Sequence, residues 1–150
     1  MDVKGKIKEV IKNHNVVHLA TVDPSGKPSV RGVDYAGSEK ENVLYFMTHK
    51  MSKKVAQIKN NPNIAVAIDH DCKSMEELQR IVFLKGTGTA TIVQDQVEAQ
   101  KAGGLMMTKF PFLKELPYNP ADMVVIKIEL KEILLTDHTV SFGNTETVTY

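Results

Sequence analysis

The stretch Phe46-Met-Thr-His-Lys-Met-Ser-Lys-Lys54 lies between two short apolar runs and sets the order of the elements around it. The run that leads into it, Val43-Leu-Tyr-Phe-Met47, is too short for a helix and is rich in strand-forming residues. The run that follows, Ile64-Ala-Val-Ala-Ile68, has the same character. We therefore expect one strand before the quoted stretch and another after it.

A short helix is predicted between these two strands. Val55 and Ile58 recur at helical spacing, and Ser52 is a residue type that often caps a helix N-terminus. The helix should end at Asn60-Asn61-Pro62, because the residue before a proline is disfavoured in the α conformation. This order places the start of the helix where the first strand ends.

Two hydroxyls and three lysines gather around the predicted helix start: Thr48, Lys50, Ser52, Lys53 and Lys54. The unpaired N–H groups and the dipole of a helix N-terminus attract anions, whereas lysines at the same end weaken a helix that has nothing bound. A bound phosphate would reverse that penalty. The pattern therefore indicates a phosphate clamp, and the alternative is a basic face that is merely solvated.

Length and composition indicate one soluble domain over residues 1–150. The chain has 42% hydrophobic and 25% charged residues, which is typical of a globular protein with a core. The net charge of +1 gives no electrostatic case for a nucleic acid or an anionic membrane as partner. With one cysteine, no apolar run of membrane length and no visible signal sequence, a cytoplasmic location is expected.

The remaining elements follow from apolar periodicity and turn residues. The longest strand is expected to bend at Gly86 and Gly88, because glycines inside a strand mark bulges. Gly103-Gly104 is expected to end a helix. In chain order, we predict a helix up to about residue 13, strands over 16–22, 29–36 and 80–93, a helix over 94–102, and strands over 122–130 and 133–137.

Arg31 stands out in the strand predicted over residues 29–36. Period-two alternation places its side chain on the same face as Val33 and Tyr35 and opposite Val30. An arginine that shares a face with apolar residues either lies at the edge of a sheet or meets an anion.

Several short motifs follow one another in a recognisable order: Leu-Ala-Thr-Val-Asp-Pro-x-Gly-x-Pro (19–28), Val-Arg-x-Val (30–33), Leu-Tyr-Phe-x-Thr (44–48), Ser-Lys-Lys (52–54) and Asn-Pro-x-Ile-Ala-Val (61–66). Together they resemble the pyridoxamine 5′-phosphate oxidase-like superfamily of FMN-binding split β-barrels. The resemblance covers about residues 10–95 well. It implies a mainly β fold, an antiparallel split barrel, and a homodimer with two FMN sites at the interface.

The resemblance also implies roles for individual residues. Four residues match positions that hold the FMN phosphate in the superfamily, and three match positions that line the flavin through backbone and hydroxyl contacts. The phosphate group comprises Arg31, Ser52, Lys53 and Lys54, and the flavin group comprises Phe46, Met47 and Thr48. Lys50 joins the cofactor-binding set through its place in the same loop.

The sequence departs from the true oxidases at positions that would hold the vitamin phosphate. Ala36 stands where those enzymes carry a lysine, and no arginine follows Arg80, so their C-terminal arginine–histidine pair is missing. The chain also has no tryptophan. Because anion recognition normally requires charged donors, the resemblance implies an FMN site without a site for pyridoxal-type phosphates.

The leading prediction is an FMN-dependent oxidoreductase for a small molecule, in which the flavin carries the electrons and the protein binds and orients it. No side chain is assigned as catalytic. Two alternatives stay open: haem or a deazaflavin on the same barrel, and a non-enzymatic FMN store, sensor or interaction module. Haem would need an axial ligand, for which the candidates are His14, His18, His49, His70 and His138.

Residues 105–113 are apolar and contain methionines and phenylalanines, so they are predicted to pack in the core or to form part of a dimer or substrate surface. No metal site is predicted. His14 and His18 are separated by an expected helix end, and His70-Asp71-Cys72 lacks a second group of ligands. Cys72 has no activating neighbour beyond Lys73, so a catalytic thiolate is not expected.

Overall fold

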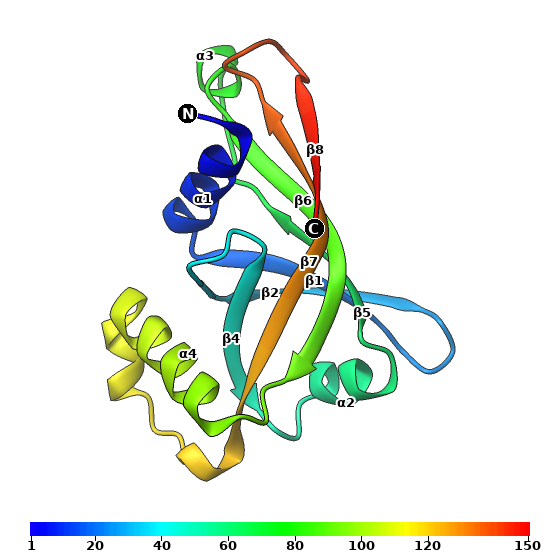
Figure 1. The fold of residues 1–150 in the computed structure, drawn as a ribbon, viewed down its shortest axis with the longest axis vertical. Coiled ribbons are helices and arrows are strands. Elements are labelled where there is room, and N and C mark those ends of the chain that lie inside the picture. The colour runs from blue at the N-terminus through cyan, green and yellow to red at the C-terminus, as the bar shows by residue number, and fades with distance from the viewer.

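The short apolar runs become eight strands of one antiparallel sheet in the computed structural model, which describes residues 1–150 (Figure 1). Neighbouring strands follow the order β2-β1-β5-β6-β7-β4-β3, and β8 pairs with the C-terminal part of β7. The strands are β1 (Val16–Val22), β2 (Pro28–Asp34), β3 (Ala36–Gly37), β4 (Val43–His49), β5 (Asn63–Ile68), β6 (Val82–Ile92), β7 (Met123–Asp137) and β8 (Thr145–Thr149). The prediction of a mainly β antiparallel fold is confirmed.

Helices and 3-10 turns pack around the sheet. They are α1 (Val3–Asn13), α2 (Lys53–Asn60), α3 (Met75–Leu78), α4 (Gln96–Lys109), η1 (Pro111–Glu115) and η2 (Pro120–Asp122). None of the helices combines the length and the apolar character needed to span a membrane.

The core lies against the curled sheet and is covered by α1 and α2 (Figure 1). α1 contributes the buried residues Ile7, Val10 and Ile11, and α2 contributes Val55 and Ile58. These are residues at helical spacing in the sequence, so the amphipathic pattern of each helix determines which face it buries.

β7 joins the two parts of the sheet. Its N-terminal half pairs with β4 and its C-terminal part with β8, while β6 pairs with it from residue 126 to residue 137. The prediction of two separate strands here is wrong. Glu132 stays in the ladder because it pairs with Thr87 of β6 and with Thr149 of β8, so the polar pair Lys131-Glu132 does not interrupt the strand.

The predicted bend in β6 is confirmed at Gly88. The register with β7 shifts between Thr87 and Gly88, and a Cβ atom on Gly88 would collide with the carbonyl oxygen of Glu129. Only glycine allows the two backbones to approach this closely, so the residue type permits the strand to curve around the core.

α4 lies against β4 and β7 on the outside of the curled sheet (Figure 1). It continues through Gly103 and Gly104 to Lys109, so the predicted helix end at the two glycines is wrong. Glycine costs about 1 kcal/mol relative to alanine in a helix. The buried side chains of Ala102 and Met106 pack under this part of α4, and that packing outweighs the low propensity.

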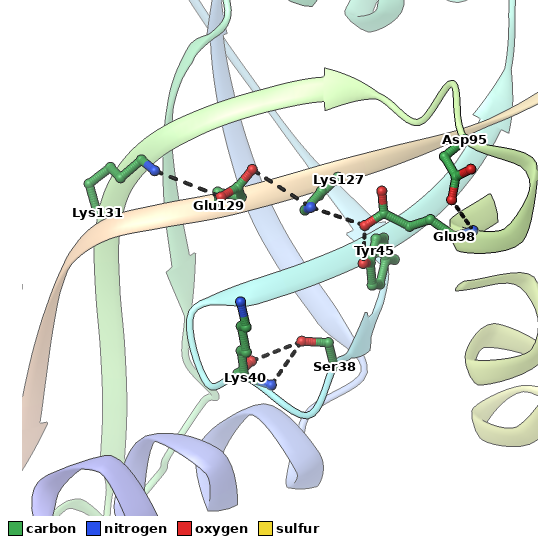
Figure 2. Close-up of polar contacts among 8 residues, drawn as sticks. All are labelled: Ser38, Lys40, Tyr45, Asp95, Glu98, Lys127, Glu129 and Lys131. Atoms are coloured by element: carbon green, nitrogen blue, oxygen red, sulfur yellow. Dashed lines mark hydrogen bonds and ion pairs between the residues drawn. The ribbon is translucent and has the colours of Figure 1, made fainter. Parts of the chain in front are cut away.

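Polar contacts fix the N-terminal end of α4, as Figure 2 shows. Glu98 accepts a hydrogen bond of 2.7 Å from the Tyr45 hydroxyl on β4 and lies 3.0 Å from the Lys127 ammonium on β7. Asp95 caps the helix by accepting a 2.9 Å hydrogen bond from the backbone N–H of Glu98. Tyr45 and Lys127 hold the pKa of Glu98 below its usual range, and burial together with Glu98 raises the pKa of Tyr45 to about 12.

Lys109 fixes the other end of α4 to α1. Its Nζ donates to the carbonyl oxygens of His14 (2.6 Å) and Ile11 (3.3 Å) and lies 4.0 Å from the centre of the Tyr35 ring. A helix C-terminus favours a cation, yet burial lowers the pKa of Lys109 to about 8. α4 is therefore anchored at both ends, and this fixes the position of the side chains between them.

Candidate functional site

The end of β4 and the start of α2 form the loop that the sequence singles out. Ser52 occupies the N-cap position, as predicted, but its side chain makes no capping hydrogen bond. Thr48 is buried, and its hydroxyl lies 3.5 Å from that of Ser52. The first turn of α2 contains no acidic residue, so the chain itself does not neutralise the positive end of the helix dipole.

Arg31 on β2 is partly buried and contacts both the sheet and α2. One terminal nitrogen donates to Thr21 Oγ1 (2.8 Å) and the Leu19 carbonyl (3.1 Å), and the other donates to Ser29 Oγ (3.0 Å) and Gln57 Oε1 (3.2 Å). All four acceptors are neutral. Because a guanidinium has five N–H groups, only the Nε–H is left for a ligand.

Lys54 supplies a second cation at this place. Burial, and then the neighbouring charge of Arg31, lower the pKa of Lys54. None of the ion pairs in the molecule involves either residue. Two partly buried positive charges that repel each other and lack a carboxylate partner would be stabilised by an anion.

A cavity of about 340 Å³ adjoins Lys54, which lines it together with Thr48. Its walls are mainly apolar and include four of the seven methionines of the chain. Methionine is flexible and polarizable and contacts aromatic rings favourably. The other lining residues are Val33, Asp34, Met47, Met106, Met107, Leu113, Leu116, Pro117, Tyr118 and Met123.

The three residues predicted to line a flavin occupy different environments. Met47 and Thr48 line the cavity. The side chain of Phe46 is packed in the core with 1% of its surface exposed. A ligand in the cavity can therefore meet the side chains of Met47 and Thr48 but not that of Phe46.

The lysines of the predicted clamp do not act as one set. Lys54 lines the cavity, whereas Lys53 is exposed and does not. Lys50 is also exposed and turns toward η2, where its Nζ lies 3.4 Å from a carboxylate oxygen of Asp122. The structure thus gathers Arg31, Ser52 and Lys54 and leaves the other two lysines at the surface.

Sequence reasoning missed Gln57, whose Oε1 accepts hydrogen bonds from both the Thr21 hydroxyl and Arg31. Its spacing of three from Lys54 places both residues on one face of α2, and that signal was available in the sequence. Asp34 and Tyr118 were also missed as cavity residues. They come from β2 and from the segment before η2, and only the fold brings them together.

The segment over residues 105–113 serves both purposes that the sequence left open. Met106 and Phe110 are buried against Ala36 of β3. Met107 and Leu113 line the cavity, as Met106 also does. The segment is therefore at once core packing and a wall of the candidate site.

The curled antiparallel sheet defines a split β-barrel, and the cavity beside the start of α2 has the size of a small-molecule pocket. The chain belongs to the pyridoxamine 5′-phosphate oxidase family, whose model matches residues 3–137. The resemblance drawn from the sequence motifs is thus confirmed.

Proteins with different names share this fold. General stress protein 26 of Bacillus subtilis (strain 168) is 27% identical over 134 residues, which cover 89% of this chain and 88% of that protein. The crystal structure of general stress protein 26 from Bacillus anthracis str. Sterne matches 100% of both chains at 26% identity with a TM-score of 0.70. A haem-binding protein from Mycobacterium smegmatis matches at 15% identity with a TM-score of 0.81, covering 99% of this chain but 58% of that one, and this likeness shows the fold alone.

Proposed function

We propose that the chain is an FMN-binding flavoprotein that acts as an oxidoreductase on a small molecule. The observation that carries this proposal is the pair Arg31 and Lys54, two partly buried cations without a carboxylate partner beside an uncapped helix N-terminus. A phosphate monoester carries close to two negative charges at neutral pH and would neutralise both. Membership of the family supports FMN as the source of that phosphate.

The residues present fit such a phosphate. The ammonium group of Lys54 makes no hydrogen bond or ion pair within the protein, and the Ser52 hydroxyl accepts from Thr48 and keeps its own proton for donation. The first N–H groups of α2 would donate to the same anion. Arg31 would contribute its charge and its Nε–H, because neutral acceptors already hold its other four donors. Arg31 would therefore make one hydrogen bond to the phosphate, whereas an arginine often makes a bidentate pair with a phosphate.

The apolar cavity fits the ring system of the same cofactor. Bound FMN would supply hydride or electron transfer. The chain would bind and orient the ring through the methionine walls around Met47 and Met107 and would exclude water from it. Thr48 lines both the cavity and the cation site, so it lies where ring and phosphate would connect.

We also propose that the working form is a homodimer with the two sites at the interface. Large apolar side chains near the site are exposed, namely Met51 (79%), Phe112 (53%) and Leu116 (49%). Exposed apolar patches often mark an interaction surface. A second copy would cover them by a two-fold, self-complementary contact.

A fluorescence titration of FMN against wild type and Lys54→Ala tests the phosphate site. Hydrogen bonds to charged groups contribute roughly 1.5–3 kcal/mol, so Lys54→Ala should weaken FMN binding roughly ten- to a hundredfold. The matched control is Lys59→Ala, which removes an exposed lysine from the other end of α2 and should leave the affinity unchanged. Equal FMN affinity in wild type and Lys54→Ala would overturn the assignment.

Three further measurements test the phosphate contact, the identity of the cofactor and the activity. Riboflavin, which lacks the phosphate, should bind weakly to wild type and equally weakly to Lys54→Ala. The visible spectrum of the purified protein should show a flavin, whereas a Soret band would replace FMN by haem. Turnover of the FMN-loaded protein with a reduced nicotinamide distinguishes an oxidoreductase from an FMN store.

A further inference from the structure

Two histidines that are far apart in the sequence meet at the surface. His14 follows the C-terminus of α1, and His70 lies in the connection after β5. The Nε2 atom of His14 lies 2.8 Å from the Nδ1 atom of His70, and the two ring centres are 5.0 Å apart. The closest approach of the two rings is therefore between a nitrogen atom of each.

The hydrogen bonding of His14 fixes which of its nitrogens carries a lone pair. Its Nδ1 lies 2.7 Å from the carbonyl oxygen of Val10. A carbonyl can only accept, so Nδ1 carries the proton, and in the neutral ring Nε2 is left with a free lone pair. A backbone carbonyl that holds one ring nitrogen while the other faces a ligand is the usual support for a metal-binding histidine.

We propose that this pair binds a divalent transition-metal ion through His14 Nε2 and His70 Nδ1. Two imidazole nitrogens on one tetrahedral Zn²⁺, each at about 2.0–2.1 Å, lie about 3.3 Å apart. The observed separation of 2.8 Å is close to this value. Binding requires His70 to move its proton from Nδ1 to Nε2 and to tilt slightly, which its exposed position in a connecting segment permits.

The surroundings leave room for water and favour a cation. Both histidines line a groove of about 600 Å³ that is separate from the proposed flavin cavity. Glu9 lines the same groove, and Asp69 and Asp71 flank His70 in the sequence. The two cationic residues that line the groove are already paired with carboxylates: Lys6 with Asp137 at 2.6 Å and Arg80 with Glu76 at 2.8 Å.

The number of ligands sets the strength and selectivity of the site. No group of three or more His, Cys, Asp or Glu side chains converges in the molecule, so water completes the coordination and the ion exchanges readily. Imidazole suits Cu²⁺, Ni²⁺ and Zn²⁺, with Cu²⁺ bound most tightly, and does not suit Mg²⁺ or Ca²⁺.

Titration of the FMN-free protein with Cu²⁺ and Zn²⁺, followed by calorimetry, tests the site. We expect one Cu²⁺ site per chain, with an electron paramagnetic resonance spectrum that shows coupling to two imidazole nitrogens. His70→Gln should weaken binding by at least about tenfold and leave one coupled nitrogen. His14→Gln should do the same, and circular dichroism checks that each variant is folded.

The matched control is His49→Gln, because His49 is another exposed histidine, at the end of β4, and its ring accepts only from the backbone N–H of Met51. It should leave both affinity and spectrum unchanged. Retention of the wild-type affinity by His70→Gln, which does not alter the contact between His14 and Val10, would overturn the proposal. So would a wild-type spectrum with a single coupled nitrogen. Neither result bears on the FMN titration, since the two sites share no residues.

Discussion

Lys109 is a partly buried amine whose protonation is coupled to folding. Burial lowers its pKa to about 8 in the folded protein, whereas an unfolded lysine has a pKa near 10.4. Between these values the unfolded chain binds more protons, so the free energy of unfolding should rise with pH. The penalty for burying the ammonium is complete below about pH 8 and disappears toward pH 10.4.

Urea unfolding of wild type and Lys109→Met at several pH values measures this effect. Other groups titrate equally in both proteins, so the stability difference in favour of wild type should grow from about pH 8 to about pH 10. A difference that stays constant over this range would show that Lys109 keeps an ordinary pKa. The lysine would then be simply a hydrogen-bond donor to His14 and Ile11.

Ala36 gives a residue-scale reason to exclude pyridoxal-type phosphates as substrates. The sequence resemblance places it where the true oxidases carry a lysine, and it is 2% exposed and packed with Met106 and Phe110. Its methyl side chain offers no hydrogen-bond donor to a phosphate. We expect the FMN-loaded protein not to oxidise pyridoxamine 5′-phosphate, and rapid formation of pyridoxal 5′-phosphate, followed by absorbance, would contradict this.

The sequence identified the charged part of the candidate site better than its apolar part. Arg31, Ser52 and Lys54 were found because they stand in short motifs of fixed spacing. Phe46 belongs to the same motif, but strand alternation turns its side chain into the core. The methionines on α4 could not be assigned, because the position of α4 depends on contacts such as that of Lys109 with α1, which join distant segments.

Glycine is required at Gly88 in β6 but not at Gly104 in α4. A Cβ atom at Gly88 would strike the backbone of Glu129, whereas one at Gly104 would meet nothing within 4 Å. Gly88→Ala should destabilise the protein by roughly 1–3 kcal/mol or more. Gly104→Ala should stabilise it by up to about 1 kcal/mol, because alanine has the higher helix propensity.

Thermal and urea unfolding of both variants check this pair of predictions. The same substitution is made in each, so the comparison separates a steric requirement in β6 from a propensity effect in α4. A Gly88→Ala protein as stable as wild type would show that the register shift between β6 and β7 does not depend on glycine.

Element boundaries were predicted well where local sequence signals determine them. They were predicted poorly where contacts with residues distant in the sequence determine them. The strand over 16–22 and the start of α2 after Ser52 agree with the structure. The end of α4 and the continuity of β7 do not, because buried Met106 and the partners of Glu132 override weak local signals. Such partners are distant in the sequence, so a local sequence pattern contains no information about them.

At the scale of the whole molecule, the proposed dimer is directly measurable. Sedimentation velocity at micromolar concentration should give a species of about twice the 16.7 kDa chain mass. Leu116→Lys would place a charge in the exposed apolar surface beside the cavity and should shift the equilibrium toward monomer. A wild-type protein that sediments as a monomer would remove the proposed interface and its shared sites.

The paired strands β4 and β7 are far apart in the sequence, and this separation affects how the chain can fold during synthesis. Val43 pairs with Glu129 and His49 with Met123, so β4 leaves the ribosome well before its partner exists. At 5–20 residues per second, the wait is roughly 4–16 s. During that time the apolar edge of β4 is open to pairing with other nascent chains. The protein should therefore rely on chaperones during synthesis, and messages that stop before β7 should yield aggregates rather than a smaller folded core.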